Sequence, residues 1–160
     1  MYRIALVLVV LLAGCRSTPK PLPTGEAMIV KVVDGDTVIV SIDGKEENVR
    51  LLGINTPETV KKNWPIECYG PEASKLTKSL LPLGTAVHLE RDIEARDAYN
   101  RLLAYIYRKD DGLFINLELM RQGDAREMSF KPNTAHATDF HQAATEAEAA
   151  GRGLWSACRT

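Results

Sequence analysis

The chain has 160 residues, of which 45% are hydrophobic and 26% are charged, and its formal net charge is −1 at pH 7. One domain is the default for this length, and the composition excludes a disordered or collagen-like chain. The near-zero charge gives no global electrostatic reason to bind nucleic acid, so any such function must come from a local cluster of basic residues.

The first 25 residues are not part of the predicted fold. After Arg3, residues 4–13 form an apolar run of ten residues, which is too short to span a bilayer and is typical of an export signal. The run ends in LAGC, which resembles the bacterial lipoprotein signal, in which cleavage leaves Cys15 as the lipidated first residue. The alternative is an ordinary secretory signal with a chance cysteine.

This leader predicts where the protein acts. We expect a signal peptide at 1–14, and a lipidated cysteine with a proline-rich tether at 15–25. The lipid would attach the protein to a membrane outside the cytoplasm, in the cell envelope. Arg16, rather than the Asp that retains such proteins at the inner membrane, follows Cys15, so the outer membrane is expected in a cell with two membranes.

Two cysteines remain in the exported part, Cys68 and Cys158. Export would place them in a compartment that permits disulfides, and their even number favours a bridge between them. Two unpaired thiols remain the alternative, because sequence alone does not establish pairing.

Short β-branched runs follow the leader. Three strands are predicted in quick succession, at 27–33, 37–42 and 47–54, joined by the bend DGD and by an Asp-Gly hairpin turn. The next stretch, 55–70, contains two prolines and has no clean period, so we expect a long loop. Loops of this length are often functional.

Helical and strand patterns alternate in the rest of the chain. A helix is predicted at 70–84, strands at 85–91 and 101–107, and two further helices at 113–123 and 138–151. Five strands with a helix between the third and the fourth is the order of an OB-fold barrel. We therefore predict a mainly β fold with α, a five-stranded OB-fold barrel with three helices.

Two carboxylates stand close together in the first bend. Asp34 and Asp36 flank Gly35, although a turn needs only one Asp or Asn beside a glycine. Ordinary turn chemistry and half of a metal site are both open at this point.

Three further charged residues lie beside apolar strands. Arg50 is within the third predicted strand, Glu58 follows its end, and Arg101 begins the fifth. Each has a plain alternative, as an outward-facing strand residue or a loop charge. An EF-hand is excluded because Val38 stands where that motif needs Asp or Asn, and the same valine excludes an aspartic protease motif.

Several stretches occur together in one order, and their combination is far more specific than each alone: VVDGDTVIV, VRLLGINTPET, YGPEAS, RLLAYIY, MRQG, KPN and GLWS. This combination resembles the staphylococcal nuclease, or thermonuclease, family over residues 27–156. The resemblance implies an OB-fold nuclease domain at 26–160. It further implies a monomer that uses calcium to hydrolyse DNA and RNA to 3′-phosphate products.

The resemblance also assigns a metal site. Asp36 and Asn55 would bind Ca²⁺ through side-chain oxygens and Thr56 through its backbone carbonyl, with Asp34 supporting the site from nearby. Hard oxygen ligands are those that calcium prefers. The family usually has Asp at position 55, so Asn55 removes one negative charge from the expected site.

The catalytic and substrate-binding roles come from the same resemblance. Glu58 would be the general base, Arg50 and Arg101 would bind the phosphate, and Tyr99 would lie beside the bound nucleotide. Guanidinium groups match phosphate oxygens and can hold the charge that grows on them in the transition state.

Two positions depart from the best-known member of the family and predict weaker substrate binding. Ala98 stands where that member has a lysine near a phosphate, and Met128 where it has a tyrosine near the nucleotide. Lys61 and Lys62, in the long loop, are expected to compensate in part.

The resemblance bears on the two cysteines as well. In the family the segment around Trp155 packs onto the body of the domain, which would bring Cys158 near Cys68. A bridge between them would close a loop of ninety residues.

A non-catalytic OB-fold module that binds nucleic acid or protein is the second functional class to weigh. Some members of the superfamily have lost the catalytic residues and serve as binding domains. This chain retains Asp36, Arg50, Glu58 and Arg101, which favours the active enzyme.

Overall fold

The computed structural model describes residues 27–60, 63 and 65–158. The predicted leader, with Cys15, and the lysines Lys61 and Lys62 lie outside the described residues. The elements in chain order are β1 (Ala27–Asp34), β2 (Thr37–Ile42), β3 (Lys45–Leu51), β4 (Ile54–Asn55), α1 (Gly70–Leu80), β5 (Ala86–Glu90), β6 (Leu102–Arg108), α2 (Ile115–Gln122), β7 (Arg126–Glu127), α3 (Ala137–Ala149) and α4 (Leu154–Ala157).

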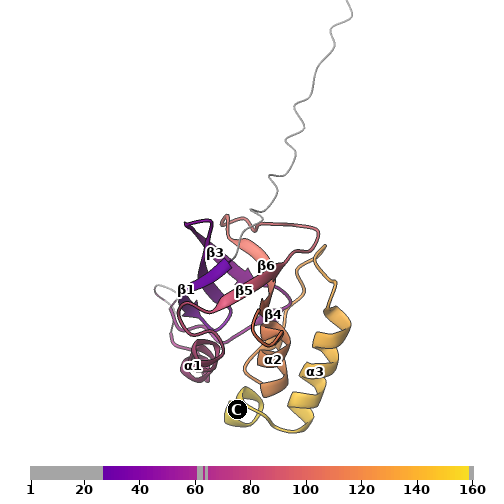
Figure 1. Ribbon diagram of the computed structural model, residues 1–160. Coiled ribbons are helices and arrows are strands. Elements are labelled where there is room, and N and C mark those ends of the chain that lie inside the picture. Colours follow the sequence, from indigo (N-terminus) through magenta and orange to yellow (C-terminus); the bar gives the residue numbers. More distant parts are fainter. Residues whose placement is uncertain (1–26, 61–62, 64, 159–160) are drawn as a thin grey trace, which may run out of the picture.

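Five of these strands close into a barrel in the order β1-β2-β3-β6-β5. Every neighbouring pair is antiparallel except β3 and β6, which run parallel. The three predicted helices lie together beneath the barrel in Figure 1. The predicted fold is therefore confirmed, and the structure adds the four-residue helix α4 and the short antiparallel pair of β4 and β7.

The third strand ends earlier than the sequence predicts. The apolar run continues to Ile54, but Gly53 has a φ of 77°, in the left-handed region that favours glycine, and it turns the chain out of β3. A Cβ at this position would lie 2.1 Å from the ring of Phe140 in α3, so glycine is also needed for space. The residues beyond the turn form β4 and pair with β7 instead.

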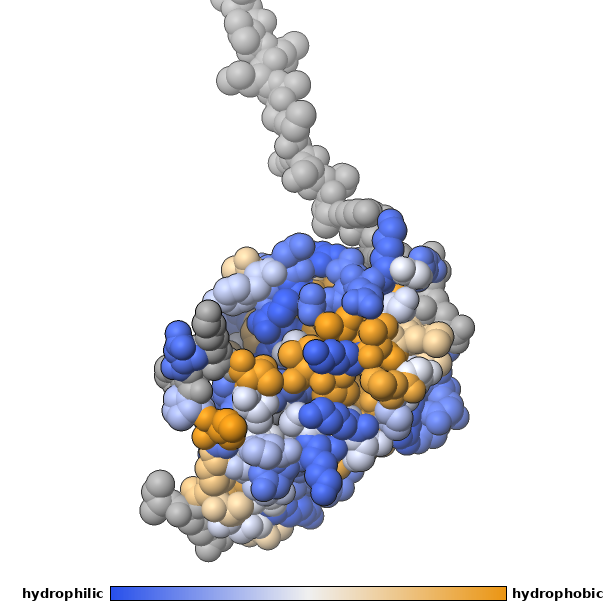
Figure 2. All heavy atoms as spheres, turned by 90° about the vertical axis from the view of Figure 1, so that its left-hand side faces the viewer, coloured by the Kyte–Doolittle hydropathy of each residue, from blue (hydrophilic) through white to orange (hydrophobic). Residues whose placement is uncertain are grey.

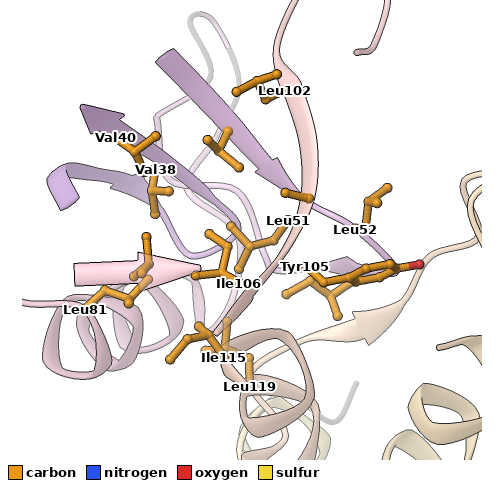
Figure 3. Close-up of a cluster of buried hydrophobic side chains, with 14 of the residues drawn as sticks. Val38, Val40, Leu51, Leu52, Leu81, Leu102, Tyr105, Ile106, Ile115 and Leu119 are labelled. Carbon is orange, nitrogen blue, oxygen red and sulfur yellow. The ribbon is translucent and has the colours of Figure 1, made fainter. Parts of the chain in front are cut away.

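Aliphatic side chains fill the barrel and join it to the helices. Figure 3 shows Val38 and Val40 of β2 near Leu51 of β3 and Ile106 of β6, all of them buried. Ile115 and Leu119 of α2 approach this group from the helical side, together with Leu81 after α1 (Figure 3). Buried and half-buried positions alternate in β2, so one face of the strand can join this core.

Apolar side chains also gather on the outer surface. Figure 2 shows them in the middle of the face that looks left in Figure 1, with hydrophilic residues around them. Met28 and Val30, on the outward side of β1, are 44% and 37% exposed. No helix in the described part of the chain is long and apolar enough to cross a membrane.

The C-terminal end is fastened to the segment before α1. Cys68 and Cys158 form a disulfide with their Cα atoms 5.9 Å apart. The bridge joins residues that are 90 positions apart in sequence, so it ties α4 to the start of α1 across the domain.

Candidate active site

Sharp turns bring the two predicted functional loops together. The carbonyl oxygen of Gly35 accepts a hydrogen bond of 2.7 Å from the hydroxyl of Thr77 in α1, which holds the DGD bend against the helix. A Cβ at Gly35 would lie 2.6 Å from Oγ1 of Thr56, so the loop after β4 approaches the bend more closely than any other residue would permit.

One cleft, of about 690 Å³, lies where these loops meet. A volume of this size is typical of a site for a small ligand or part of a larger one. Every predicted metal, catalytic and substrate residue that the structure describes lines this cleft: Asp34, Asp36, Arg50, Asn55, Thr56, Glu58, Tyr99 and Arg101.

Asp36 is the carboxylate of the bend that meets the loop after β4. Its Oδ2 accepts a hydrogen bond of 3.0 Å from the backbone N–H of Thr56 and lies 3.1 Å from Nη2 of Arg50. Its Oδ1 accepts a hydrogen bond of 3.0 Å from the hydroxyl of Thr37. These contacts fix the carboxylate although only 8% of the residue is exposed.

Arg50 is buried, so its plain alternative as an outward-facing strand residue is excluded. Nη1 donates to the carbonyl oxygens of Leu51 and Ile54, at 2.7 and 2.9 Å. Nη2 donates to Oδ1 of Asn55 at 3.1 Å and faces Asp36. Burial lowers the pKa of Arg50, and the charge of Asp36 opposes that change. Both terminal nitrogens are therefore engaged by the protein in this arrangement.

Asp34 secures the loop that carries Glu58. Oδ1 accepts hydrogen bonds from the N–H of Gly35 at 2.8 Å and from the hydroxyl of Thr59 at 2.6 Å, and Oδ2 accepts one of 3.1 Å from the N–H of Thr59. The two aspartates of the bend thus have different roles. Asp34 positions the loop that carries Glu58, and Asp36 contacts Arg50.

Glu58 is held by its own loop. Oε1 accepts hydrogen bonds from the N–H groups of Thr59 and Val60, at 3.0 and 2.9 Å. The N–H of Glu58 donates to Oε2 of Glu67 at 3.0 Å, and its carbonyl oxygen accepts a bond of 2.9 Å from the N–H of Glu67. Glu67 therefore closes the base of this loop and places Glu58 in the cleft, a role that the sequence analysis missed.

Arg101 approaches the cleft from the start of β6, and Asp97 holds it there. Nε of Arg101 donates to Oδ2 of Asp97 at 2.7 Å, and the backbone N–H groups of Tyr99 and Arg101 donate to Oδ1 at 3.0 and 2.9 Å. Burial would raise the pKa of Asp97, but the bonds and charge of Arg101 bring it below its ordinary value. Nη1 and Nη2 of Arg101 have no hydrogen-bond partner within the described ranges.

Tyr99 lies on the open side of the same turn. It is 81% exposed, and Cζ of Arg101 is 5.5 Å from the centre of its ring. An exposed ring beside a guanidinium is a surface on which a base can stack.

Besides Glu67, sequence reasoning missed two residues that shape this site. Asp97 stands four positions before Arg101, and an acid at that distance from an expected phosphate-binding arginine was the available signal. Phe130 packs against Arg50, with its ring centre 5.3 Å from Cζ, and no sequence feature indicated that contact. Met128, noted as a departure from the family, places its sulfur 3.9 Å from Nη2 of Arg50.

The charges of the cleft favour a cation. Its lining contains two guanidinium groups and five carboxylates: Asp34, Asp36, Glu58, Glu67 and Asp97. Such a lining repels a phosphate until a positive ion enters. The oxygen atoms of Asp36 and Asn55 that face Arg50 are hard donors of the kind that Ca²⁺ prefers, so the donor set fits calcium in chemistry.

The expected ligands would supply only part of a calcium shell. Among the residues that the structure describes, no three Asp, Glu, His or Cys side chains come together as a metal-binding group. The two side-chain oxygens and the carbonyl of Thr56 that are expected as ligands would leave positions for water and substrate, because calcium takes about 6–8 ligands.

Comparison with known proteins places these residues in context. The family profile described as "Staphylococcal nuclease homologue" matches residues 48–157. A protein of Staphylococcus intermedius called "Thermonuclease" is 42% identical over 132 residues, which cover 82% of this chain and 77% of that protein. The "Thermonuclease" of Staphylococcus hyicus is 40% identical over 128 residues, with 80% and 74% covered. "Endonuclease YncB" of Bacillus subtilis (strain 168) is 39% identical over 128 residues, with 79% and 59% covered.

Proposed function

The chain belongs to the staphylococcal nuclease family, and on that premise we propose that it is a calcium-dependent endonuclease that hydrolyses DNA and RNA outside the cytoplasm. The observation that carries the proposal is the convergence of Asp36, Arg50, Glu58 and Arg101 on one cleft. A general base, a cation ligand and two phosphate-binding groups are the parts that phosphodiester hydrolysis needs.

Arg101 is the group best placed to receive the phosphate. Asp97 holds its Nε, so the guanidinium plane is oriented before substrate arrives. The side chain is 30% exposed, so its two terminal nitrogens can reach a phosphate oxygen from the cleft. Donors that are fixed in advance stabilise charge in the transition state without paying for reorganisation at that moment.

Glu58 is the group expected to orient and deprotonate the attacking water. The amides of Thr59 and Val60 fix one carboxylate oxygen. The water would attack phosphorus as its proton passes to Glu58, and the bond to the 5′-oxygen would break. The released 5′-oxygen would take up a proton, which leaves a 3′-phosphate end.

Calcium would be held by Asp36, Asn55 and the carbonyl of Thr56, and when bound it would polarise a phosphoryl oxygen. The residues themselves support this assignment, because two of their oxygen atoms face the same nitrogen of Arg50. A cation that took these oxygens would leave Nη2 of Arg50 available to the phosphate. The cation and Nη2 of Arg50 would thus compete for the same two oxygen atoms, one of Asp36 and one of Asn55.

The contacts proposed for the substrate involve the backbone of the nucleic acid and do not distinguish its base sequence. Arginine and calcium meet phosphate, and Tyr99 offers a ring face that any base can cover. We therefore expect weak sequence preference and action on both DNA and RNA. Lys61 and Lys62 would add phosphate contacts from the loop that follows Glu58.

The place of action is proposed from the leader alone. Its apolar run and LAGC motif support export, lipidation of Cys15 and tethering in the cell envelope, with the nuclease domain acting as a monomer. Metabolic labelling with a radioactive fatty acid tests this part. Label in the wild type and none in Cys15→Ala is the expected result, and label in neither would contradict it.

The competing class is a binding module without catalysis. It shares the barrel and the basic groups but has no use for a carboxylate held as Glu58 is. An assay that measures DNA binding and DNA hydrolysis on the same preparation, with calcium or with chelator, separates the two. Binding with no hydrolysis under calcium would favour the module.

A further inference from the structure

A second cavity lies away from the cleft. It has a volume of about 560 Å³ and lies between α1, the end of α2 with Asp124 beyond it, and the turn that precedes α4. Its lining residues are Tyr69, Glu72, Lys75, Leu76, Ser79, Gln122, Asp124, Arg152 and Gly153. None of the described residues that line this cavity also lines the cleft.

The walls of this cavity are fixed before any ligand binds. The N–H of Leu154 donates to the carbonyl oxygen of Gly123 at 2.9 Å, and a Cβ at Gly153 would lie only 2.4 Å from that oxygen. The disulfide between Cys68 and Cys158 joins the end of α4, the helix that follows this turn, to the segment just before α1. In Figure 1 the C-terminal end accordingly lies beneath α1 and α2.

Asp124 is the unusual residue of this cavity. It is 4% exposed, and its carboxylate has no hydrogen-bond or ion-pair partner within the part of the chain that the structure describes. Burial raises the pKa of Asp124 to about 6, and the neighbouring charge of Glu72 adds to that effect. Burying a charged carboxylate without a partner costs free energy, and a bound cation would offset that cost.

We propose that this cavity binds an organic cation, with an ammonium or guanidinium group on Asp124 and Glu72 and its carbon stem against Leu76. Asp124 and Glu72 supply two carboxylates to the lining, which also contains the basic side chains of Lys75 and Arg152, and the hydroxyl groups of Tyr69 and Ser79 offer further acceptors. Free amines and the side chains of lysine or arginine share this chemistry.

A metal ion fits the cavity less well. Only two of its lining residues are carboxylates, and the described residues include no group of three that could hold a metal. The volume is that of a site for an organic molecule of modest size. The apolar side chain of Leu76 can also pack against a hydrocarbon stem, whereas it offers no ligand atom to a metal ion.

Calorimetric titration of the full-length protein with agmatine, which carries both a guanidinium and an ammonium group, tests the proposal. Saturable binding to one site is expected, with at least tenfold weaker affinity in Asp124→Asn and a smaller loss in Glu72→Gln. Asp43→Asn makes the same chemical change in the exposed β2–β3 turn and should bind as the wild type does. If Asp124→Asn does not fold, Glu72→Gln decides the question.

Further arms separate the sources and locate the site. Tighter binding of Nα-acetyl-arginine amide than of agmatine would indicate that the natural ligand is a side chain of a protein partner. Tighter binding of agmatine would indicate that it is a free amine. Equal affinity in Asp124→Asn, or loss of binding in Asp36→Asn alone, would overturn the proposal, because agmatine would then occupy the cleft. Binding of Mg²⁺ but of neither amine, lost in Asp124→Asn, would overturn the organic-cation assignment. Because Asp124 has no part in the cleft, its asparagine variant should retain nuclease activity even where agmatine binding is lost.

Discussion

Arg50 and Asp36 form a buried ion pair in which Nη2 of the arginine lies 3.1 Å from Oδ2 of the aspartate. The same Nη2 donates to Oδ1 of Asn55 at 3.1 Å. The two side-chain oxygens proposed for calcium are therefore the two that contact Nη2 of Arg50. Cation binding and the freedom of Arg50 to meet phosphate are thus linked, because both draw on the same pair of oxygens.

Asn55→Asp should tighten calcium binding. The change restores a carboxylate to a site in which Asp36 is the only expected charged ligand, and charge count tunes calcium affinity. Calcium titration by calorimetry measures the effect without reference to activity. Asn63→Asp adds the same charge at an exposed loop position outside the cleft and should leave the affinity unchanged. Equal or weaker affinity in Asn55→Asp would mean that the pocket is built around asparagine.

Arg101→Ala should lower the rate of DNA hydrolysis by about a hundredfold, because loss of one donor to the transition state typically costs on the order of 3 kcal/mol. The fold should persist, since the side chain lies at the edge of the cleft and is 30% exposed. Arg121→Ala removes an exposed arginine from α2 and serves as the matched control. Near-wild-type rates in Arg101→Ala would remove this residue from the mechanism.

Asp97→Asn should reduce the rate by a smaller factor, about tenfold, because it weakens the contact that orients Arg101 without removing the guanidinium. Asp97 is a positioning residue, since it contacts Nε of Arg101 and the backbone N–H groups of its turn. Its effect should appear mainly in kcat if orientation matters in the transition state. In the Arg101→Ala background the same change should cost little, and an undiminished effect there would contradict the positioning role.

Removal of the disulfide should destabilise the domain while leaving the cleft intact. The bridge closes 90 positions of chain, and the loss of this constraint on the unfolded state costs up to about 4 kcal/mol. Urea unfolding of the paired variant Cys68→Ala with Cys158→Ala, compared with the oxidised wild type, measures the change. A shared unfolding midpoint would show that the bridge adds no stability.

The barrel could be predicted from the sequence because its strands carry local signals. The Asp-Gly turn and the β-branched runs placed β1 and β2 within one residue of their observed bounds. The early end of β3 could not be predicted in the same way. It follows from the left-handed turn at Gly53, where the close approach of Phe140, a residue far away in the chain, also leaves room only for glycine.

The cleft residues could be named from their resemblance to a family, but their partners could not. Nothing in the sequence indicates that Nη1 of Arg50 donates to the carbonyl oxygens of Leu51 and Ile54. Nor does it indicate that Asp34 accepts hydrogen bonds from Thr59 instead of facing Arg50. Such details depend on rotamers within a crowded site. The same holds for Asp124, which is buried and lines a cavity together with residues of α1 and of the turn before α4 that lie far from it in the chain.

Hydrolysis of DNA by the full-length protein, in calcium and in excess chelator, shows whether the cleft is a calcium-dependent active site, with Glu58→Ala as the inactive control. We expect cleavage to 3′-phosphate ends in calcium, loss of cleavage in chelator, and a rate at least about a hundredfold lower in Glu58→Ala, as for the loss of a general base. Equal cleavage in chelator would contradict the metal role. Cleavage by Glu58→Ala at the wild-type rate, or DNA binding without cleavage in calcium, would contradict the proposed enzyme.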